Sequence, residues 1–368
     1  MVDRASFPAH RTDPDRVLAI RGGRPLIGIY PISGAKNSAL PLMIAALLTA
    51  ESVTLCNTPA NLDIAVLADL LRSLGASVEW SRDNAGLSTT ISAEKLYPTQ
   101  IQDELVTRMR ASVLLLGALL VRTGEASLPM PGGDVIGLRS IDHHLYGLRS
   151  LGAQIELTNG LIEARAPAGL HGADIALPQS SVGATENLLL AAVLARGTTI
   201  IRNAAREPEI ADLAACLSEM GAKISGLGTA GLTVEGRQSL AGTTHNVIPD
   251  RIEFGTLACA AALTDGELLM PNARMELLGA AAPVLVSAGV QLTGIDNGVL
   301  TRRGDTGLLG VDVVTRPYPG FATDLQAPTM ALLSVAAGAS TIAETIDSDT
   351  SMNCAGWVRA SQFAARLL

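Results

Sequence analysis

The eleven residues LLRSLGASVEW (70–80) decide the fold, because three later stretches share their layout. These are GLRSLGAQIEL (147–157), CLSEMGAKISG (216–226) and VLVSAGVQLTG (284–294). In each stretch, the end of an amphipathic helix is followed by a glycine and then by the alternating apolar residues of a half-buried strand. The four glycines are Gly75, Gly152, Gly221 and Gly289. Their spacings of 77, 69 and 68 residues predict a repeated α/β unit.

Further helices with apolar faces are predicted between these stretches. They cover residues 39–50, 111–121, 185–195 and 252–263. Stacked units of helix, strand, helix and strand predict an array in which the sheets face solvent and the helices lie inside. Such a chain is expected to form two lobes with a cleft between them, since ligand sites favour domain interfaces.

The composition agrees with a large enzyme-like chain of about two domains. Of the 368 residues, 48% are apolar but only 3% are aromatic, so the core must consist of Ala, Leu, Ile and Val. A net charge of −8 argues against a nucleic-acid binder, which would carry a basic face. An acidic protein can still bind anions where its arginines converge.

Several features predict a cytoplasmic protein without membrane insertion. The four cysteines show no C-x-x-C spacing, which opposes a zinc site or a disulfide framework. They are Cys56, Cys216, Cys259 and Cys354. The first sixteen residues contain no apolar signal region, and the apolar runs at 40–48 and 111–121 are too short to cross a bilayer.

Seven motifs, in the same order, carry a resemblance to a known family. They are PISGAKNSALPLMIAALL (31–48), TRMRASVLLLG (107–117), PGGDVIGLR (131–139), SSVGATEN (180–187), NAAREPEIADL (203–213), VIPDRIEFGT (247–256) and YPGFATDLQA (318–327). From about residue 17 to about residue 346 the chain resembles the UDP-N-acetylglucosamine enolpyruvyl transferases. The family fold is a two-domain, inside-out α/β barrel of βαβαββ-type repeats. The resemblance implies a first domain of three repeats at 33–247. It implies a second, incomplete domain at 1–32 plus 248–368.

The resemblance also implies the chemistry. The family transfers enolpyruvyl from phosphoenolpyruvate to the 3′-hydroxyl of UDP-N-acetylglucosamine and releases phosphate, the first committed step of peptidoglycan synthesis. Those two compounds are the expected partners. No metal or other cofactor is expected, because arginine and lysine can stabilise the phosphate and carboxylate charges.

Lys36 stands just before a helical run, where its ammonium can join helix-terminal N–H groups in an anion site. By resemblance, Lys36 is catalytic and Asn37 holds the sugar. Arg110 and Arg139 would bind phosphoenolpyruvate, with Arg139 also near the nucleotide. Arg108 is expected to be a solvated surface residue.

The resemblance implies two stretches of residues that contact the nucleotide, and two further single residues. The uridine would lie along Arg139, Ser140, Ile141, Asp142 and His143. The diphosphate would meet Ser181, Val182 and Gly183, and Thr323 and Ile346 would add contacts. Ser140 replaces a usual proline, and Gln179 stands where the family often has a lysine, which removes a positive charge. The adjacent His143 and His144 are expected to be solvated helix residues rather than metal ligands.

Two aspartates are assigned to proton transfer. Asp324 in YPGFATDLQ is expected to be the general base for the sugar hydroxyl, or a cap of a helix over 325–336, or both. Asp134 in PGGD stands on a glycine-rich loop, where most relatives carry a general-acid cysteine; a surface turn is the simpler alternative. A carboxylic acid can also deliver a proton, but it lacks the thiolate that an epoxide alkylates. We therefore expect insensitivity to fosfomycin.

After residue 346 the sequence departs from the family pattern. The codons of 352–361, read one base earlier after a G, can encode Asp-Glu-Leu-Arg-Arg-Met-Gly-Ala-Arg-Val, which is the expected helix end with its glycine. An out-of-frame reading from about Ser348 is the favoured explanation, and a deletion that leaves VRAS (358–361) is the alternative. Either change predicts an incomplete second domain and doubtful activity, since two further arginines would be missing.

Two other functions remain open on the sequence. The chain could transfer enolpyruvyl to another acceptor, such as shikimate phosphate or a nucleoside. It could instead be a non-catalytic paralogue that binds a UDP-sugar. The uridine-loop residues favour a UDP-sugar over shikimate.

Overall fold

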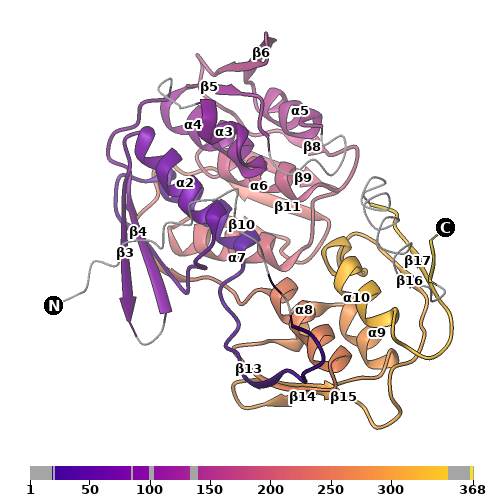
Figure 1. Ribbon diagram of the computed structural model, residues 1–368. Coiled ribbons are helices and arrows are strands. Elements are labelled where there is room, and N and C mark those ends of the chain that lie inside the picture. The colour runs from indigo at the N-terminus through magenta and orange to yellow at the C-terminus, as the bar shows by residue number, and fades with distance from the viewer. Residues whose placement is uncertain are drawn as a thin grey trace. The chain divides into compact units, whose positions relative to one another are not determined.

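The computed structural model describes residues 19, 21–83, 86–98, 103–132 and 140–346, and the backbone of 365–367. Asp134 and Arg139, and the residues that the reading-frame hypothesis concerns, lie outside these ranges. The described chain divides into two compact units (Figure 1). Unit 1 comprises residues 34–248, and unit 2 comprises the residues before and after it.

Unit 1 contains three sheets with the same plan. The first has the order β12 (Thr243–Asn246), β2 (Val53–Cys56), β4 (Gly86–Ser92), β3 (Ser77–Asp83). The second has the order β5 (Glu125–Pro129), β7 (Leu161–Arg165), β6 (Gln154–Thr158). The third has the order β8 (Asp174–Ala176), β9 (Thr198–Arg202), β11 (Gly231–Glu235), β10 (Lys223–Ser225). In each, the third strand of a repeat pairs antiparallel with both the first and the second strand.

The helices of unit 1 alternate with these strands along the chain. They are α1 (Lys36–Ala45), α2 (Leu62–Ser73), α3 (Asp103–Thr107), α4 (Leu115–Thr123), α5 (Asp142–Ser150), α6 (Val182–Ala192) and α7 (Pro208–Glu219), with 3₁₀ turns η1 (Ala46–Leu48) and η2 (Arg110–Leu114). The helices predicted from sequence are present, with their starts displaced by up to four residues. Short 3₁₀ turns take up part of two of them.

The four repeat glycines have the conformation that the sequence predicts. Gly75, Gly152, Gly221 and Gly289 have φ angles of 98°, 97°, 103° and 91°. A side chain is strained in this left-handed region, so glycine is the residue that ends each helix without cost. The strands β3, β6, β10 and, in unit 2, β14 follow directly, which confirms the repeated α/β unit.

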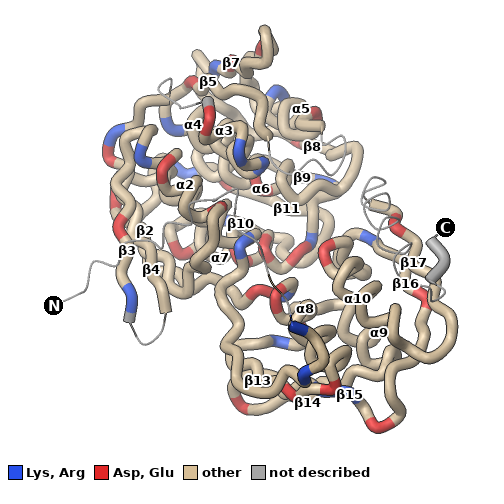
Figure 2. Tube along the Cα trace, in the orientation of Figure 1, with Lys and Arg blue, Asp and Glu red and all other residues tan. Residues whose placement is uncertain are grey.

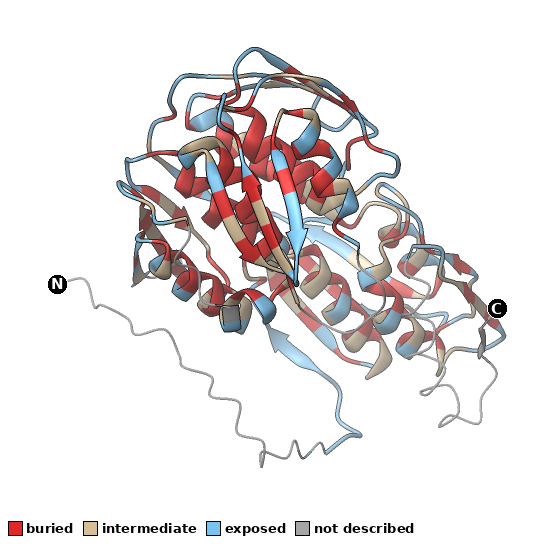
Figure 3. Ribbon diagram, turned by 90° about the horizontal axis from the view of Figure 1, so that it is seen from above, coloured by how far each residue is buried: buried red, intermediate tan, exposed pale blue. Residues whose placement is uncertain are grey.

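The core of unit 1 is built from the first helix of each repeat. Eight of the ten residues of α1 and nine of the eleven of α6 are buried. The strands β2 and β4 alternate between buried and less buried residues, so one face of their sheet is turned to solvent. Buried residues dominate the inner helices, and exposed residues are frequent in the loops (Figure 3). Helices inside and sheets outside confirm the predicted mixed α/β fold. The sheets of the described residues stay separate and close into no barrel, because each ends at an edge strand.

Unit 2 repeats the plan in one sheet, whereas the described strands of its other sheet all pair parallel. One sheet has the order β1 (Ile27–Ile29), β13 (Glu267–Pro271), β15 (Gly298–Arg303), β14 (Val290–Ile295), and the other β16 (Val313–Val314), β17 (Ser340–Ala343), β18 (Ala365–Leu367). Its helical segments are α8 (Arg251–Leu263), η3 (Met275–Leu278), α9 (Ala281–Ser287), η4 (Thr323–Leu325) and α10 (Gln326–Leu333). The apolar core around Phe254 and Leu325 is distinct from that of unit 1. None of the described helices is both long and apolar enough to traverse a lipid bilayer.

Candidate active site

Lys36 is the first residue of α1, where helix N–H groups have no intrahelical partner. Its Nζ lies 3.1 Å from Oδ2 of Asp63, in the first turn of α2, and both side chains are about two-fifths exposed, at 44% and 40%. The turn before it requires Gly34, since a Cβ there would lie 1.8 Å from the carbonyl oxygen of Asn57. The SGAKN motif therefore places an accessible ammonium at the start of a buried helix. Asn37 beside it is exposed.

Arg110 and Ser140 meet although thirty residues separate them. Arg110 starts η2, and its Nη2 donates a hydrogen bond of 2.9 Å to the carbonyl oxygen of Ser140. The hydroxyl of Ser140 accepts from the backbone N–H of Asp142, the first residue of α5, at 3.0 Å. The structure thus joins three of the predicted binding residues in one hydrogen-bonded group.

The start of α6 lies against α5. Ser181 caps α6, because its Oγ accepts from the N–H of Ala184 at 3.3 Å. A Cβ at Gly183 would lie 3.0 Å from Cε1 of His144, so only glycine fits without displacing that ring. The predicted diphosphate residues therefore lie next to the histidine pair.

His144 corrects one expectation. It is only 5% exposed rather than solvated, whereas His143 is half-buried. The burial follows from tertiary packing against α6, which the sequence of α5 does not reveal. No group of three or more metal-binding side chains occurs among the residues that the structure describes.

Asn187 of α6 holds His144 in place. Its Nδ2 donates to Nδ1 of His144 at 3.0 Å and to the carbonyl of Val113 at 3.0 Å, while its Oδ1 accepts from the N–H of Gly117 at 2.8 Å. Because Nδ1 of His144 accepts, we assign the ring proton to Nε2. Burial, then the charges of Arg110 and His143, lower the pKa of His144 to about 3. The ring is therefore neutral at physiological pH.

This depressed pKa predicts a loss of stability in acid. The unfolded chain takes up a proton at His144 near its ordinary pKa of 6.5, whereas the folded chain does not until about 3. The free energy of unfolding should therefore fall by about 1.4 kcal/mol for each pH unit between these values. Urea denaturation between these pH values measures how the free energy of unfolding changes with pH. In His144→Gln this change should be smaller by the contribution of one proton. The exposed His171→Gln is the matched control and should keep it; an unchanged slope in His144→Gln would refute the assignment.

A second buried group escaped the sequence analysis. Glu186 of α6 is fully buried, and burial, then the charges of Glu209 and Glu207, raise its pKa well above the ordinary value. The pair Glu186-Asn187 interrupts an otherwise apolar helix. That interruption was the signal available in the sequence.

The predicted residues of unit 2 surround Glu344. Its Oε1 accepts from Oγ1 of Thr323 at 2.9 Å and from the N–H of Ile346 at 2.8 Å. Asp324, between them in η4, is exposed. The predicted cap role of Asp324 is wrong, because α10 begins after Leu325 and has no side-chain cap.

Within unit 1 the sequence-predicted residues cluster around helix starts. The turn η2, which begins at Arg110, packs against both α1 and α6. Lys36 and Arg110 begin two of these neighbouring segments and Ser181 caps the third, and N–H groups at helix starts favour anions. Over the two units as a whole, basic and acidic residues are interspersed (Figure 2).

Repeated α/β units with their helices inside, and cations at the starts of those helices, define a protein class suited to binding anions. Comparison with known proteins identifies the family. A family model described as EPSP synthase (3-phosphoshikimate 1-carboxyvinyltransferase) matches residues 20–355. The chain therefore belongs to this family of carboxyvinyltransferases, the enzymes that transfer enolpyruvyl groups.

Several individual proteins are similar to the chain over most of its length. The UDP-N-acetylglucosamine 1-carboxyvinyltransferase of Acidiphilium cryptum is 53% identical over 329 residues, which are 89% of this chain and 78% of the relative. The protein of the same name from Granulibacter bethesdensis has the same identity and coverage. Among solved structures, the enolpyruvyl transferase NikO from Streptomyces tendae aligns with a TM-score of 0.78 and 26% identity, over 89% of this chain and 77% of that chain. EPSP synthase from Acinetobacter baumannii, at TM-score 0.68 and 18% identity over 92% of this chain and 79% of that chain, shares the fold.

Proposed function

We propose that the chain transfers enolpyruvyl from phosphoenolpyruvate to the 3′-hydroxyl of UDP-N-acetylglucosamine and releases phosphate. The observation that carries this proposal is 53% identity over 89% of the chain to relatives that bear the corresponding name. It supports a role in peptidoglycan synthesis. A part in cell-wall biogenesis, cell shape and cell division, in the cytoplasm, belongs to the same proposal. The identity favours this reaction over another acceptor or a non-catalytic role.

The binding roles follow the clusters in unit 1. Lys36 and Arg110 would neutralise the phosphate and carboxylate of phosphoenolpyruvate, with Arg139 as a further cation. The Arg110–Ser140 bond supports a role for Ser140, Ile141, Asp142 and His143 beside the uridine. Ser181, Val182 and Gly183 start α6, where free N–H groups suit the diphosphate. Thr323 and Ile346, both bonded to Glu344, would complete the nucleotide contacts.

Three proton transfers complete the reaction. Asp324, exposed in η4, would accept the proton of the sugar hydroxyl as its oxygen bonds to C2 of phosphoenolpyruvate. Asp134 would donate a proton to the methylene carbon and so form a tetrahedral intermediate. Asp134, left as a carboxylate, would then take back a methyl proton as the C–O bond to phosphate breaks, and Lys36 and Arg110 would stabilise the charge of the departing phosphate.

Turnover of the full chain tests the proposal. Phosphate release should require both phosphoenolpyruvate and UDP-N-acetylglucosamine, and the product mass should equal that of the nucleotide sugar plus enolpyruvyl. Replacing the sugar by 3-phosphoshikimate or a nucleoside should abolish release. A nucleotide-dependent rise in melting temperature without any phosphate release would instead establish the UDP-sugar-binding paralogue.

Fosfomycin gives a prediction at Asp134. Wild-type activity should survive prolonged incubation with fosfomycin, because a carboxylate offers no thiolate for alkylation. The variant Asp134→Cys should remain active and become inactivated over time, with the adduct mass on the new thiol. Time-dependent inactivation of the wild type with an adduct on Asp134 would contradict the prediction.

A further inference from the structure

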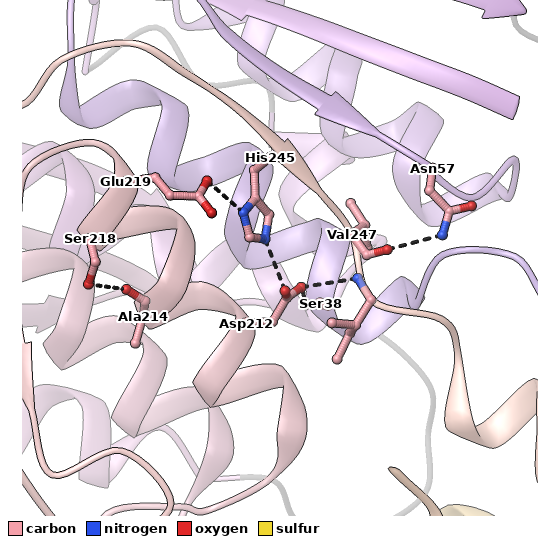
Figure 4. A network of polar contacts seen from close by, with 9 residues as sticks. Ser38, Asn57, Asp212, Ala214, Ser218, Glu219, His245 and Val247 are labelled. Atoms are coloured by element: carbon pink, nitrogen blue, oxygen red, sulfur yellow. Dashed lines mark hydrogen bonds and ion pairs between the residues drawn. The ribbon is translucent and has the colours of Figure 1, made fainter. Parts of the chain in front are cut away.

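His245 lies between two carboxylates in unit 1 (Figure 4). It stands in β12 and is 6% exposed. Its Nε2 lies 2.9 Å from Oδ1 of Asp212 and its Nδ1 lies 2.9 Å from Oε2 of Glu219, both in α7. Ionised carboxylates only accept hydrogen bonds, so both ring nitrogens must carry protons. The geometry therefore describes an imidazolium held at both ends.

The electrostatics agree with this geometry. Burial lowers the pKa of His245, but the hydrogen bonds and charges of Asp212 and Glu219 outweigh it and leave the pKa raised above its ordinary value. Asp212 is buried, whereas Glu219 is about half exposed. The charge of the buried Asp212 therefore depends more than that of Glu219 on the nearby imidazolium to offset the loss of hydration.

The described partners on β2 and α1 carry no charge. In β2, the residue opposite His245 is Leu55, and α1 contributes Ser38 through Asp212. Cys216 of α7 is a further titratable neighbour of the two carboxylates. Burial, then Glu219 and Asp212, raise the pKa of its thiol to about 12, so it stays neutral.

Asp212 connects this imidazolium to both sides of Lys36. Its Oδ2 accepts a short hydrogen bond from Oγ of Ser38, two residues after Lys36. The same oxygen accepts from the N–H of Ile248 at 3.4 Å, and the carbonyl of Ile248 accepts from the N–H of Ala35 at 2.7 Å. One carboxylate thus ties down the residues that flank the catalytic lysine.

We infer that His245 is a positioning residue for Lys36 and Asn37, acting through Asp212 and Ser38. The inference rests on the proposed function only where it predicts kinetics. When His245 loses a proton, one ring nitrogen presents a lone pair to a carboxylate, and the contact becomes repulsive. The turn at residues 35–38 then loses its anchor, and the ammonium of Lys36 moves from the position that phosphate requires.

Steady-state kinetics of His245→Gln provide the first test, with His171→Gln as the matched control. Glutamine can bond one carboxylate but carries no charge, so kcat/KM for phosphoenolpyruvate should fall by about 10-fold to 100-fold. The wild type should lose activity as the pH rises above the ordinary pKa of histidine and His245 deprotonates, and His245→Gln should lack that step in its pH profile. Adding Ser38→Ala to His245→Gln should cost little more, since both changes break one chain of contacts.

A second measurement does not need turnover. Nitrogen-15 NMR of the wild type should show His245 protonated at both ring nitrogens at neutral pH. Amide hydrogen exchange in His245→Gln should accelerate at Ala35, Ser38 and Ile248, but not in the control. Failure of the wild type to release phosphate would refute the proposed function and leave this measurement valid. A neutral His245 ring, or a His245→Gln enzyme with wild-type kinetics and pH profile and only lower thermal stability, would overturn the inference.

Discussion

Lys36→Ala should lower kcat/KM for phosphoenolpyruvate by about 10³-fold, the upper range for removal of one group that stabilises developing charge. Lys36 occupies the first position of α1 with its ammonium still accessible. In the proposed reaction, phosphate departure would place negative charge beside Lys36, and no other lysine stands at the start of a described helix of unit 1. The loss should appear mainly in kcat, because the charge on the leaving group grows in the transition state.

A matched control separates charge removal from damage to the fold. Lys223 in β10 forms an ion pair of 3.0 Å with Glu235, comparable to the 3.1 Å between Lys36 and Asp63, and is also exposed. Lys223→Ala should keep wild-type kinetics, and both variants should lose less than about 1 kcal/mol of stability, as exposed ion pairs contribute little. A Lys36→Ala enzyme within a few-fold of wild type would remove Lys36 from the catalytic assignment.

Asn187→Leu should destabilise the protein by about 4 kcal/mol, because it strands three buried partners without hydrogen bonds. Asn187 is fully buried, and it bonds Gly117, Val113 and His144 across three segments of the core. Leucine has the same branching and number of side-chain heavy atoms but is larger, so the loss reports the unpaired groups together with some overpacking, and not a cavity. Against a typical total of about 5–15 kcal/mol, such a loss should greatly lower the urea midpoint.

The contrasting variant is Thr199→Val in β9. The hydroxyl of Thr199 is buried and has no hydrogen-bond partner among the described residues. Valine removes that polar group at equal size, so stability should stay within about 0.5 kcal/mol of wild type or rise. Equal effects of the two substitutions would show that the Asn187 bonds contribute nothing net.

Local patterns sufficed to predict the repeated α/β unit and the mixed fold. The glycines after α2, α5, α7 and α9 carry a backbone requirement that is written in the sequence itself. The same holds for Lys36, whose place at a helix start follows from the neighbouring residues. The seven motifs, in their fixed order, predicted the enzyme class, and the comparisons confirm it.

The errors and omissions concern contacts between distant segments. His144 looked solvated because its burial depends on α6, some forty residues later. His245 went unnoticed because its partners Asp212 and Glu219 lie 33 and 26 residues away. The cap role of Asp324 failed because a 3₁₀ turn precedes α10. Such features arise from packing, which periodicity alone does not encode.

In two sheets, one edge strand pairs parallel with a strand that is far away in the sequence. β12 completes the sheet of β2 from almost 200 residues further along the chain, and β1 completes the sheet of β13 from before unit 1 begins. The ribosome must therefore synthesise residue 246 before β12 can complete the sheet of β2. It must synthesise residue 271 before β1 can pair with the whole of β13. Until then both sheets present bare edges, and pairings this remote in sequence form slowly. Nascent chains of this protein are thus exposed to misassociation for most of their synthesis.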